Sequence, residues 1–520
     1  MKGCVANRED TRESRMGRKD EAMTTESTQY GKQVHPDEVV QKDELHEACG
    51  LFGVYDNDEM DVARLTYLGL YAVQHRGQEG CGIAVNDEGE IYGQKGLGLV
   101  PDVFTDRVLD RLTGKMAIGH TRYSTTGANT VENCQPLIVN YRNSRVALAH
   151  NGNLVNAVAL RRELEDKGAV FQTSTDSEVI ANLISRYRLQ YSNIEAVLTE
   201  TMNTIQGSYA IVMLTPKRLI GLRDPYGIRP LCIGRLDNSY VLASETCALD
   251  TVGARFIRDV EPGEIVLIGE DGIESIRVSE RRRQLCVFEH IYFARPDSFI
   301  DGASVYQARL EAGRRLARTH PVEADLVIGV PDSGLTAAIG FSRESGIPYG
   351  EGLIKNRYVG RTFIQPQQKQ REQSVRIKLN ALSGEVRGKR VVMIDDSIVR
   401  GTTSRNIVSM LKDAGATEVH MRISSPPVMH PCHFGIDIAS RSQLIAASHS
   451  VEEIRRYLGA DSLGYLSVEE MVACPAGRKG DGFCTGCFSG TYPIPVPEEA
   501  DKMAMETLDG PLPHKMPEEE

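Results

Sequence analysis

The sequence predicts two folded domains of different class, an α+β domain followed by an α/β domain built on a parallel sheet. In the first half, short strand-like runs bounded by Gly or Asn, such as Met116–Gly119, alternate with helix-like runs. From about Gln284 onward the pattern becomes a repeat of strand, loop and helix, as in the βαβ units of a parallel sheet. The apolar run Val391–Ile394 is the clearest of these strands, because it stops at two aspartates and a predicted helix follows.

The composition is that of an ordinary globular protein, with 41% hydrophobic and 25% charged residues among 520. No apolar stretch reaches the roughly 20 residues that a membrane helix needs, and the polar amino terminus does not look like a secretory signal. We therefore expect a cytoplasmic protein that binds no membrane. The net charge of −11 gives no reason to expect nucleic-acid binding. With 11 cysteines and no signal peptide, catalysis or metal binding is a better hypothesis than a disulfide framework.

Changes in composition divide the chain into four segments. Residues 1–48 are polar and charged, so we expect a disordered leader. Residues 49–280 form the first predicted domain, and residues 281–470 form the second. Residues 471–520 complete the chain with a CxxC motif and a loose tail that is rich in Pro, Glu, Met and Lys.

The loop that follows Val391–Ile394 has the composition of a phosphate site. Asp395 and Asp396 come first, and a loop of Ser, Thr and Gly leads into a predicted helix over 403–414. Ligands of open α/β sheets bind beyond the carboxyl ends of the strands, and N–H groups at the start of a helix favour anions. The carboxylates can hold ribose hydroxyls, although any doubly wound protein can end a strand in two aspartates. The run resembles the phosphoribosyl pyrophosphate (PRPP) loop of the type I phosphoribosyltransferases.

The first domain contains a candidate nucleophile, Cys49, at the point where the polar leader meets an apolar strand. Taken alone, such a cysteine is more often structural. Four motifs follow it, at residues 75–79 (HRGQE), 120–125 (HTRYST), 150–154 (HNGNL) and 173–178 (TSTDSE). In this order they resemble the glutamine amidotransferases with an amino-terminal cysteine. The resemblance implies the N-terminal-nucleophile (Ntn) hydrolase fold, an αββα sandwich.

The same resemblance implies roles for individual residues of this domain. Cys49 would attack the amide of glutamine, with its own α-amine, of reference pKa about 7.7–8.0, as the base. Asn151 and the N–H of Gly152 would stabilise the oxyanion. The histidines of the motifs would pack in loops rather than act in catalysis. The residues that would bind glutamine are Arg122, Asp176 and Gly77. For Arg122 and Asp176, a surface ion pair is the alternative.

A free amine on Cys49 requires the removal of residues 1–48, because a peptide bond to that nitrogen abolishes its basicity. Some branches of the family process such a leader themselves. The leader is long for that pattern, so translation that starts at Met16 or Met23 is an alternative.

The second domain contains another candidate loop at residues 330–334 (VPDSG), after an apolar strand. The resemblance makes it the pyrophosphate loop, and Ser333 would join Asp395 and Asp396 around Mg²⁺, which prefers oxygen ligands. Residues 355–372 would form a cationic lid over PRPP, with a solvated surface loop as the alternative. The residues implied to bind PRPP are Asp332, Ser333, Gly334, Lys355, Asp395, Asp396, Ser397, Arg400, Gly401, Thr402 and Thr403.

Together the two halves resemble the glutamine PRPP amidotransferase family. The resemblance implies that glutamine, PRPP and water give 5-phosphoribosylamine, glutamate and diphosphate, the first committed step of purine (IMP) synthesis. Ammonia would pass between the sites through an apolar passage, purine nucleotides would inhibit, and the enzyme would be a homotetramer. Two rivals differ in one half. An enzyme that makes glucosamine 6-phosphate would carry a sugar isomerase as its second half, and the paired aspartates argue against it. A PRPP-sensing regulator would lack the glutamine half or its cysteine, and this chain has both.

Four further cysteines match a metal-binding pattern. Cys484 and Cys487 form a CxxC motif, which on its spacing alone indicates zinc, redox chemistry or nothing. Cys286 and Cys432 fill the two other ligand positions of the family branch that binds a 4Fe–4S cluster and has a cleaved leader. The resemblance implies a structural cluster that holds the carboxyl segment on the transferase domain. Zinc is the alternative, and Cys474 is predicted to be structural.

Overall fold

The computed structural model describes residues 49–123, 129–141, 144–356, 379–438, 440–477, 480 and 482–497. The predicted leader (1–48), most of the predicted lid (357–372) and the tail from residue 498 lie outside them. All described residues belong to one compact unit, residues 43–520. Among them, no helix is both long enough and apolar enough to span a membrane.

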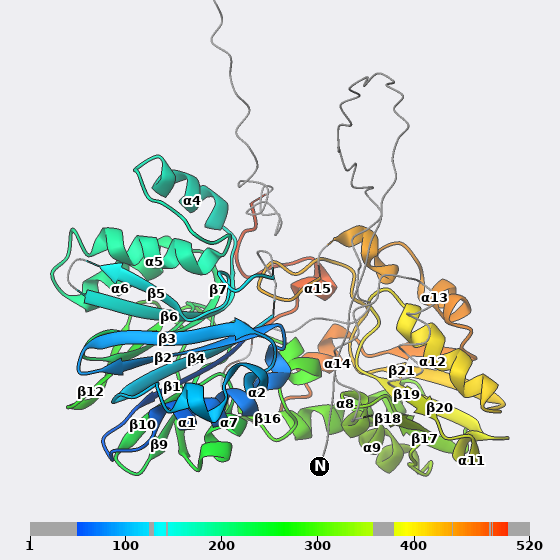
Figure 1. The fold of residues 1–520 in the computed structure, drawn as a ribbon. Coiled ribbons are helices and arrows are strands. Elements are labelled where there is room, and N and C mark those ends of the chain that lie inside the picture. Colours follow the sequence, from blue (N-terminus) through cyan, green and yellow to red (C-terminus); the bar gives the residue numbers. More distant parts are fainter. Residues whose placement is uncertain are drawn as a thin grey trace, which may run out of the picture. The chain divides into compact units, whose positions relative to one another are not determined.

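The first domain consists of two antiparallel sheets that lie between layers of helices (Figure 1). The seven-stranded sheet has the order β11 (Arg255–Asp259), β9 (Cys232–Leu236), β10 (Ser239–Ala243), β1 (Gly50–Tyr55), β4 (Met116–Arg122), β2 (Gly80–Asp87), β3 (Glu90–Leu97). The six-stranded sheet has the order β13 (Gly272–Arg277), β12 (Glu264–Gly269), β8 (Leu219–Arg223), β7 (Gly207–Leu214), β6 (Ser144–Leu154), β5 (Leu137–Tyr141).

Strand β1 illustrates why the two sheets stack. Successive side chains of a strand point to opposite faces, and every residue of β1 is buried. Leu51 and Tyr55 pack between the sheets, whereas Phe52 and Val54 pack against the helices on the outer face. Those helices are α1 (Val62–Ala72) and α7 (Thr246–Val252); the six-stranded sheet is covered by α4 (Ala157–Glu165), α5 (Asp176–Tyr187) and α6 (Ile194–Thr204). The predicted αββα sandwich is confirmed.

The second domain is built on a four-stranded parallel sheet. Its order is β17 (Leu326–Gly329), β20 (Arg390–Asp395), β21 (Glu418–Ile423), β22 (Ser462–Tyr465). Val392 and Ile394 face one core, with helices α8 (Val305–Thr319) and α9 (Gly334–Ser345). Val391 and Met393 face the other core, with helices α12 (Thr402–Asp413) and α13 (Val451–Leu458). The predicted parallel-sheet domain is confirmed, because both faces of these apolar strands are covered by helices.

Short elements connect and extend these layers. In the first domain they are η1 (Gln74–Arg76), α2 (Val100–Val103) and α3 (Asp106–Leu109). In the rest of the described chain they are β14 (Leu285–Cys286), the π-helix η2 (Glu289–Phe293), β15 (Phe299–Ile300), β16 (Ala303–Ser304), β18 (Leu353–Lys355), β19 (Leu379–Ala381), α11 (Ser383–Val386), η3 (Arg441–Gln443), η4 (Ile445–Ala447), α14 (Val468–Val472), β23 (Phe483–Cys484) and α15 (Gly486–Ser489). Strands β14 and β23 pair in parallel, so the carboxyl segment is joined to the start of the second domain.

Buried ion pairs connect the two domains. The guanidinium of Arg76, in η1, contacts the carboxylates of both Glu245 and Glu289, and all three side chains are fully buried. Burial alone would raise the pKa of Glu245, but Arg76 and His75 hold it well below its usual range. Glu289 also lies 3.3 Å from Nη1 of Arg229. Because a buried charge without a partner is costly, these pairs fix the segment after β14 against the first domain.

Candidate active site

Cys49 directly precedes β1, and the pairing of Gly50 with Thr121 places it beside the end of β4. The Sγ atom of Cys49 lies 3.7 Å from the carbonyl oxygen of Tyr123. Burial raises the pKa of this thiol, while the charges of Arg122 and Arg229 act to lower it. Since only the thiolate is a good nucleophile, Cys49 needs a base that takes its proton.

Asn151 and Gly152 lie on β6, in the other sheet; Asn151 is buried and Gly152 is partly exposed. Neither amide atom of the Asn151 side chain has a hydrogen-bond partner among the described residues, although both are buried. Gly152 has φ +146°, and a Cβ there would lie 2.1 Å from the carbonyl oxygen of Ser208. Buried polar groups normally have a hydrogen-bond partner. The partner of the Asn151 amide can therefore be an oxygen of the bound substrate, as its predicted role as an oxyanion donor requires.

The three residues predicted to bind glutamine surround the same end of the sandwich. Arg122 and Asp176 are 2% and 6% exposed, so they do not form a surface ion pair. Both of their charges act on the thiol of Cys49, and Oδ2 of Asp176 accepts a hydrogen bond from the N–H of Leu154 at 3.0 Å. A Cβ on Gly77 would lie 2.5 Å from the carbonyl carbon of Thr121. Glycine therefore allows this segment to pack against the end of β4.

The expectation that the motif histidines pack in loops is wrong for His120 and His150, which are buried inside strands β4 and β6. Burial, with Arg122 adding to it, lowers the pKa of His120 to about 3, so its ring is neutral. Nδ1 of His150 lies 3.2 Å from Oγ of Ser177 and 3.5 Å from Oδ1 of Asp176. His150 faces α5, where its ring helps to hold Asp176 in place, whereas Nε2 of His120 lies 3.2 Å from the carbonyl oxygen of His150.

The aspartate loop and the 330–334 loop meet at the carboxyl edge of the parallel sheet. Oγ of Ser333 donates to Oδ1 of Asp396 at 2.5 Å, and Oγ of Ser397 donates to its Oδ2 at 2.7 Å. A Cβ on Gly334 would lie 2.3 Å from the carbonyl oxygen of Ile394. Burial raises the pKa of Asp396, while the Ser333 hydrogen bond acts to lower it. The neighbouring positions of β17 and β20 thus bring together loops that are 63 residues apart.

The other predicted PRPP residues belong to the same edge of the sheet. Nζ of Lys355 contacts Oδ2 of Asp332 at 2.6 Å. Gly401 has φ +84° and directly precedes α12, whose first two residues are Thr402 and Thr403. The guanidinium of Arg400 donates to Oε1 of Gln443 at 2.8 Å. The described part of the predicted lid ends at Asn356, so its remaining residues lie outside the described chain.

The four predicted cluster cysteines lie in one hydrophobic core. Cys286 pairs with Cys484 across β14 and β23, and Cys432 and Cys487 belong to the same core. Burial raises the pKa of Cys286, Cys484 and Cys487, and the thiols of the set raise one another's further. In the described chain, no three or more His, Cys, Asp or Glu side chains are arranged to hold a single metal ion. Four buried thiols are the donor set of a four-thiolate site, and the cluster stays a prediction.

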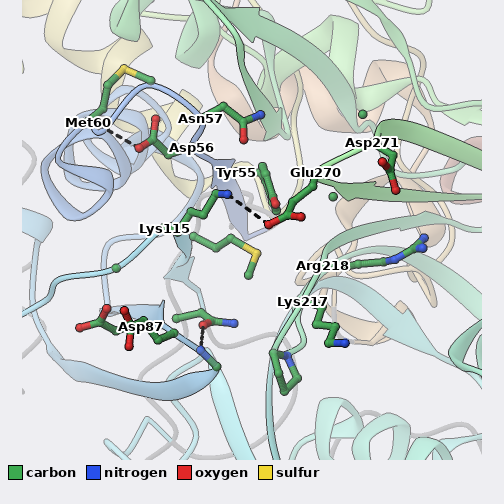
Figure 2. Close-up of a pocket in the computed structure, with 18 of the residues that line it drawn as sticks. Tyr55, Asp56, Asn57, Met60, Asp87, Lys115, Lys217, Arg218, Glu270 and Asp271 are labelled. Carbon is green, nitrogen blue, oxygen red and sulfur yellow. Dashed lines mark hydrogen bonds and ion pairs between the residues drawn. The ribbon is translucent and has the colours of Figure 1, made fainter.

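A cavity of about 1050 Å³ lies at the other end of the first domain, where β1 ends at Tyr55 (Figure 2). Lys115 reaches toward Glu270, with Nζ and Oε1 3.7 Å apart. The predicted site residues do not line this cavity. Because a strand advances about 3.3 Å per residue, Tyr55 lies about 20 Å along β1 from Cys49.

The fold and the two sites define a class of protein, a glutamine-hydrolysing domain joined to a phosphoribosyl-transferring domain. Residues 120–251 match the family model of the glutamine amidotransferase domain, and residues 305–424 match that of the phosphoribosyl transferase domain. The amidophosphoribosyltransferases of Archaeoglobus fulgidus and Bacillus subtilis are 54% and 52% identical to this chain, each over 87% of it and over 99% and 95% of their own lengths.

A solved structure agrees with these relatives. The B. subtilis glutamine PRPP amidotransferase complexed with ADP and GMP is 51% identical over 87% of this chain and 98% of that chain, with a TM-score of 0.82. The chain belongs to the amidophosphoribosyltransferase family. It is therefore an enzyme, a glutamine-dependent phosphoribosyltransferase.

The sequence analysis missed three groups that touch the glutamine site or its surroundings: Arg229, Glu289 and the carbonyl of Phe434. Arg229 acts on the thiol of Cys49 and contacts both other groups. These positions are spread over more than 200 residues and belong to none of the four motifs of the glutamine domain, so no local pattern could have assigned them to its site.

Proposed function

We propose that this chain converts glutamine, PRPP and water into 5-phosphoribosylamine, glutamate and diphosphate, the first committed step of purine synthesis. One observation carries the proposal. A single chain combines a buried thiol and a buried amide that the described residues leave unbonded, both in the first domain, with a Ser–Asp cluster at the carboxyl edge of a parallel sheet. The first arrangement suits acyl transfer from an amide, and the second suits a ribose phosphate.

Measurement of diphosphate release tests this function directly. Purified enzyme should release diphosphate from PRPP only when glutamine or ammonia is also present, and it should form one glutamate for each diphosphate when glutamine is the donor. Diphosphate release that needs neither nitrogen donor would contradict the proposal, as would glutamate formation without any transfer to PRPP.

In the glutamine half-reaction, the Cys49 thiol loses its proton to the α-amine of the mature chain and attacks the side-chain amide carbon. The oxyanion that forms accepts hydrogen bonds from Nδ2 of Asn151 and the N–H of Gly152. The protonated amine then returns its proton to the departing nitrogen, which leaves as ammonia. Water hydrolyses the thioester to glutamate. Arg122 would bind the α-carboxylate with two hydrogen bonds, and Asp176 would bind the α-ammonium.

Replacement of Asn151 by Ala tests the oxyanion role. We expect kcat for glutamine hydrolysis to fall by about 10²–10³-fold, the cost of removing one oxyanion donor in other enzymes. Thermal stability should change little, because the described protein makes no hydrogen bond to this amide. Kinetics with glutamine and a thermal melt measure both effects.

Asn86→Ala is the matched control for that variant. Asn86 is a buried asparagine of β2 whose amide donates to the carbonyl of Thr215 at 2.7 Å and accepts from the N–H of Gly89 at 2.8 Å. The Asn86→Ala substitution should lower the melting temperature and leave kcat for glutamine unchanged. The opposite result for either variant would contradict the assignment of Asn151.

In the PRPP half-reaction, Ser333, Asp395 and Asp396 would hold Mg²⁺, because their oxygens suit that cation. When bound, Mg²⁺ would offset charge on the leaving diphosphate. The N–H groups at the start of α9 and α12 would bind the phosphates, and Lys355 would neutralise further charge. Unprotonated ammonia attacks the ribose C1, so we propose that it arrives through an apolar passage that keeps it from bulk water.

We propose that four cysteines would hold a 4Fe–4S cluster, namely Cys286, Cys432, Cys484 and Cys487. The cluster would supply no chemistry to the reaction but would fix the carboxyl segment on the second domain.

We also propose that mature enzyme begins at Cys49. The mass and visible absorbance of protein purified anaerobically test both points. We expect a mass that corresponds to residues 49–520 and a brown, iron-containing protein. Active enzyme with an intact bond before Cys49, or colourless enzyme without iron, would contradict them.

Regulation and assembly are also proposals. The B. subtilis relative was solved with ADP and GMP, and we propose that purine nucleotides inhibit this chain, which steady-state assays with both nucleotides will test. We propose a homotetramer, which analytical ultracentrifugation will test.

We also propose that the enzyme is cytoplasmic. The cytoplasm suits an enzyme with a thiol nucleophile and four thiolate ligands, because thiols stay reduced there.

A further inference from the structure

The segment Cys432–Ile438, called the strap below, crosses from the second domain to the glutamine site. The amide of Asn153 donates to the carbonyl of His433 at 2.9 Å. Oγ of Ser208 donates to the carbonyl of Phe434 at 2.8 Å. Asn153 and Ser208 face each other on β6 and β7. The strap therefore lies across the strand that carries Asn151 and Gly152.

Arg229 makes the strongest contacts with the strap. Its Nη2 and Nε donate to the carbonyl of Phe434 at 2.6 and 3.1 Å, and its side chain is fully buried. The backbone of Arg229 is fixed as well, because the carboxylate of Asp224 accepts hydrogen bonds from the N–H groups of Ile228 and Arg229. Arg229 is thus a rigid, charged donor, and charge-assisted hydrogen bonds are stronger than neutral ones.

The strap touches the residue that the oxyanion role requires. A Cβ on Gly435 would lie 3.1 Å from the carbonyl group of Gly152 and 2.8 Å from Nη2 of Arg229. On its other side, Gly152 packs against β7, because a Cβ on Gly152 would lie 2.1 Å from the carbonyl oxygen of Ser208. The backbone of Gly152 is therefore held between β7 and the strap. The strap contacts the carbonyl of Gly152, and this peptide shares the Cα of Gly152 with the peptide that carries its N–H, so the direction of the N–H depends on how the strap is held.

We propose that Arg229 is a positioning residue for glutamine hydrolysis, which it serves by holding the Phe434 carbonyl and thereby the strap against Gly152. This inference rests on the proposed function of the glutamine site. Arg229 acts through the strap and the peptide of Gly152, whereas glutamine itself is bound by Arg122 and Asp176. Its loss should therefore change kcat for glutamine and leave KM for glutamine unchanged.

Three variants test the proposal. In Arg229→Met, kcat for the glutamine-dependent reaction should fall by about 10²-fold, the cost of a small misplacement in an active site, while the ammonia-dependent reaction stays at the wild-type rate. Arg229→Lys keeps one charged donor and should recover part of the loss. Ser208→Ala removes an uncharged donor to the same carbonyl and should lower kcat in the same direction but by less. If Arg229→Met fails to fold, the result for Ser208→Ala still tests the proposal.

Arg258→Met is the matched control. Arg258 and Glu264 form a two-point ion pair in the same domain, with contacts of 2.7 and 2.8 Å, and Glu264 is buried. This variant should melt at a lower temperature and keep wild-type kcat with both nitrogen donors. Iron content, measured on each preparation, should equal that of wild type in all four variants.

Three outcomes would overturn the proposal. The first is an equal fall of the glutamine-dependent and ammonia-dependent rates in Arg229→Met, and the second is a loss of iron that accompanies the fall. The third is wild-type kcat in both Arg229→Lys and Ser208→Ala. Wild-type enzyme assayed with both nitrogen donors tests the proposed function separately, because a wild type without glutamine-dependent activity would refute that function rather than the role of Arg229.

Discussion

Replacement of Cys49 by Ala is expected to abolish the glutamine-dependent reaction and to leave the ammonia-dependent reaction at its wild-type rate. Loss of a nucleophile costs on the order of 10⁶-fold in kcat in a well-studied hydrolase, so no glutamate should be detectable. The paired aspartates do not take part in amide cleavage, and added ammonia replaces the product of the first site. Coupled assays for diphosphate and glutamate measure both reactions on one preparation.

Cys232→Ala is the control for this variant. Cys232 is a buried thiol of β9, in the same sheet as β1, and its Sγ lies 3.3 Å from the carbonyl of Ala243. It should retain both activities, since its burial raises its pKa well above the usual value and leaves it an inert thiol. Glutamine-dependent turnover by Cys49→Ala would exclude Cys49 as the nucleophile.

The double variant Asp395→Asn, Asp396→Asn should show the reverse pattern. We expect diphosphate release to fall by on the order of 10³-fold with either nitrogen donor, because charge stabilisation of the leaving group is lost. Glutamine hydrolysis should persist, since the thiol site lies in the other domain. Isothermal titration with PRPP and Mg²⁺ should also show weakened binding.

Asp325→Asn is the matched control for the aspartate pair. Asp325 precedes β17 at the amino edge of the same sheet and pairs with Arg390, with Oδ1 and Nη2 2.9 Å apart. Its pKa is lowered to about 2, first by the side-chain hydrogen bond from Arg390, yet it faces the edge where ligands of such sheets do not bind. It should keep both reactions. Full activity in the double variant would show that PRPP does not bind at Asp395 and Asp396.

Much of the fold and of the candidate site was predictable from short stretches of sequence. The apolar run Val391–Ile394 and the aspartates after it predicted a buried parallel strand, and β20 is that strand. Asn151 and Gly152 were identified through the motif that contains them, and both lie on β6, with the side chain of Asn151 buried. Such features succeed because the residues that make them are adjacent in the chain. The prediction that the motif histidines pack in loops was wrong for His120 and His150, because a motif does not reveal whether its residues lie in a loop or a strand.

The sequence by itself determined the two domain classes, the candidate nucleophile and the two loops of the PRPP site, because each depends on side-chain chemistry over a few consecutive residues. Only the tertiary structure decided that Arg76 binds Glu289 and that Arg229 binds the carbonyl of Phe434, which is 205 residues away. The physical reason is that a buried charge takes its partner from whatever the packed chain brings within reach. That choice depends on topology, and no local pattern records it.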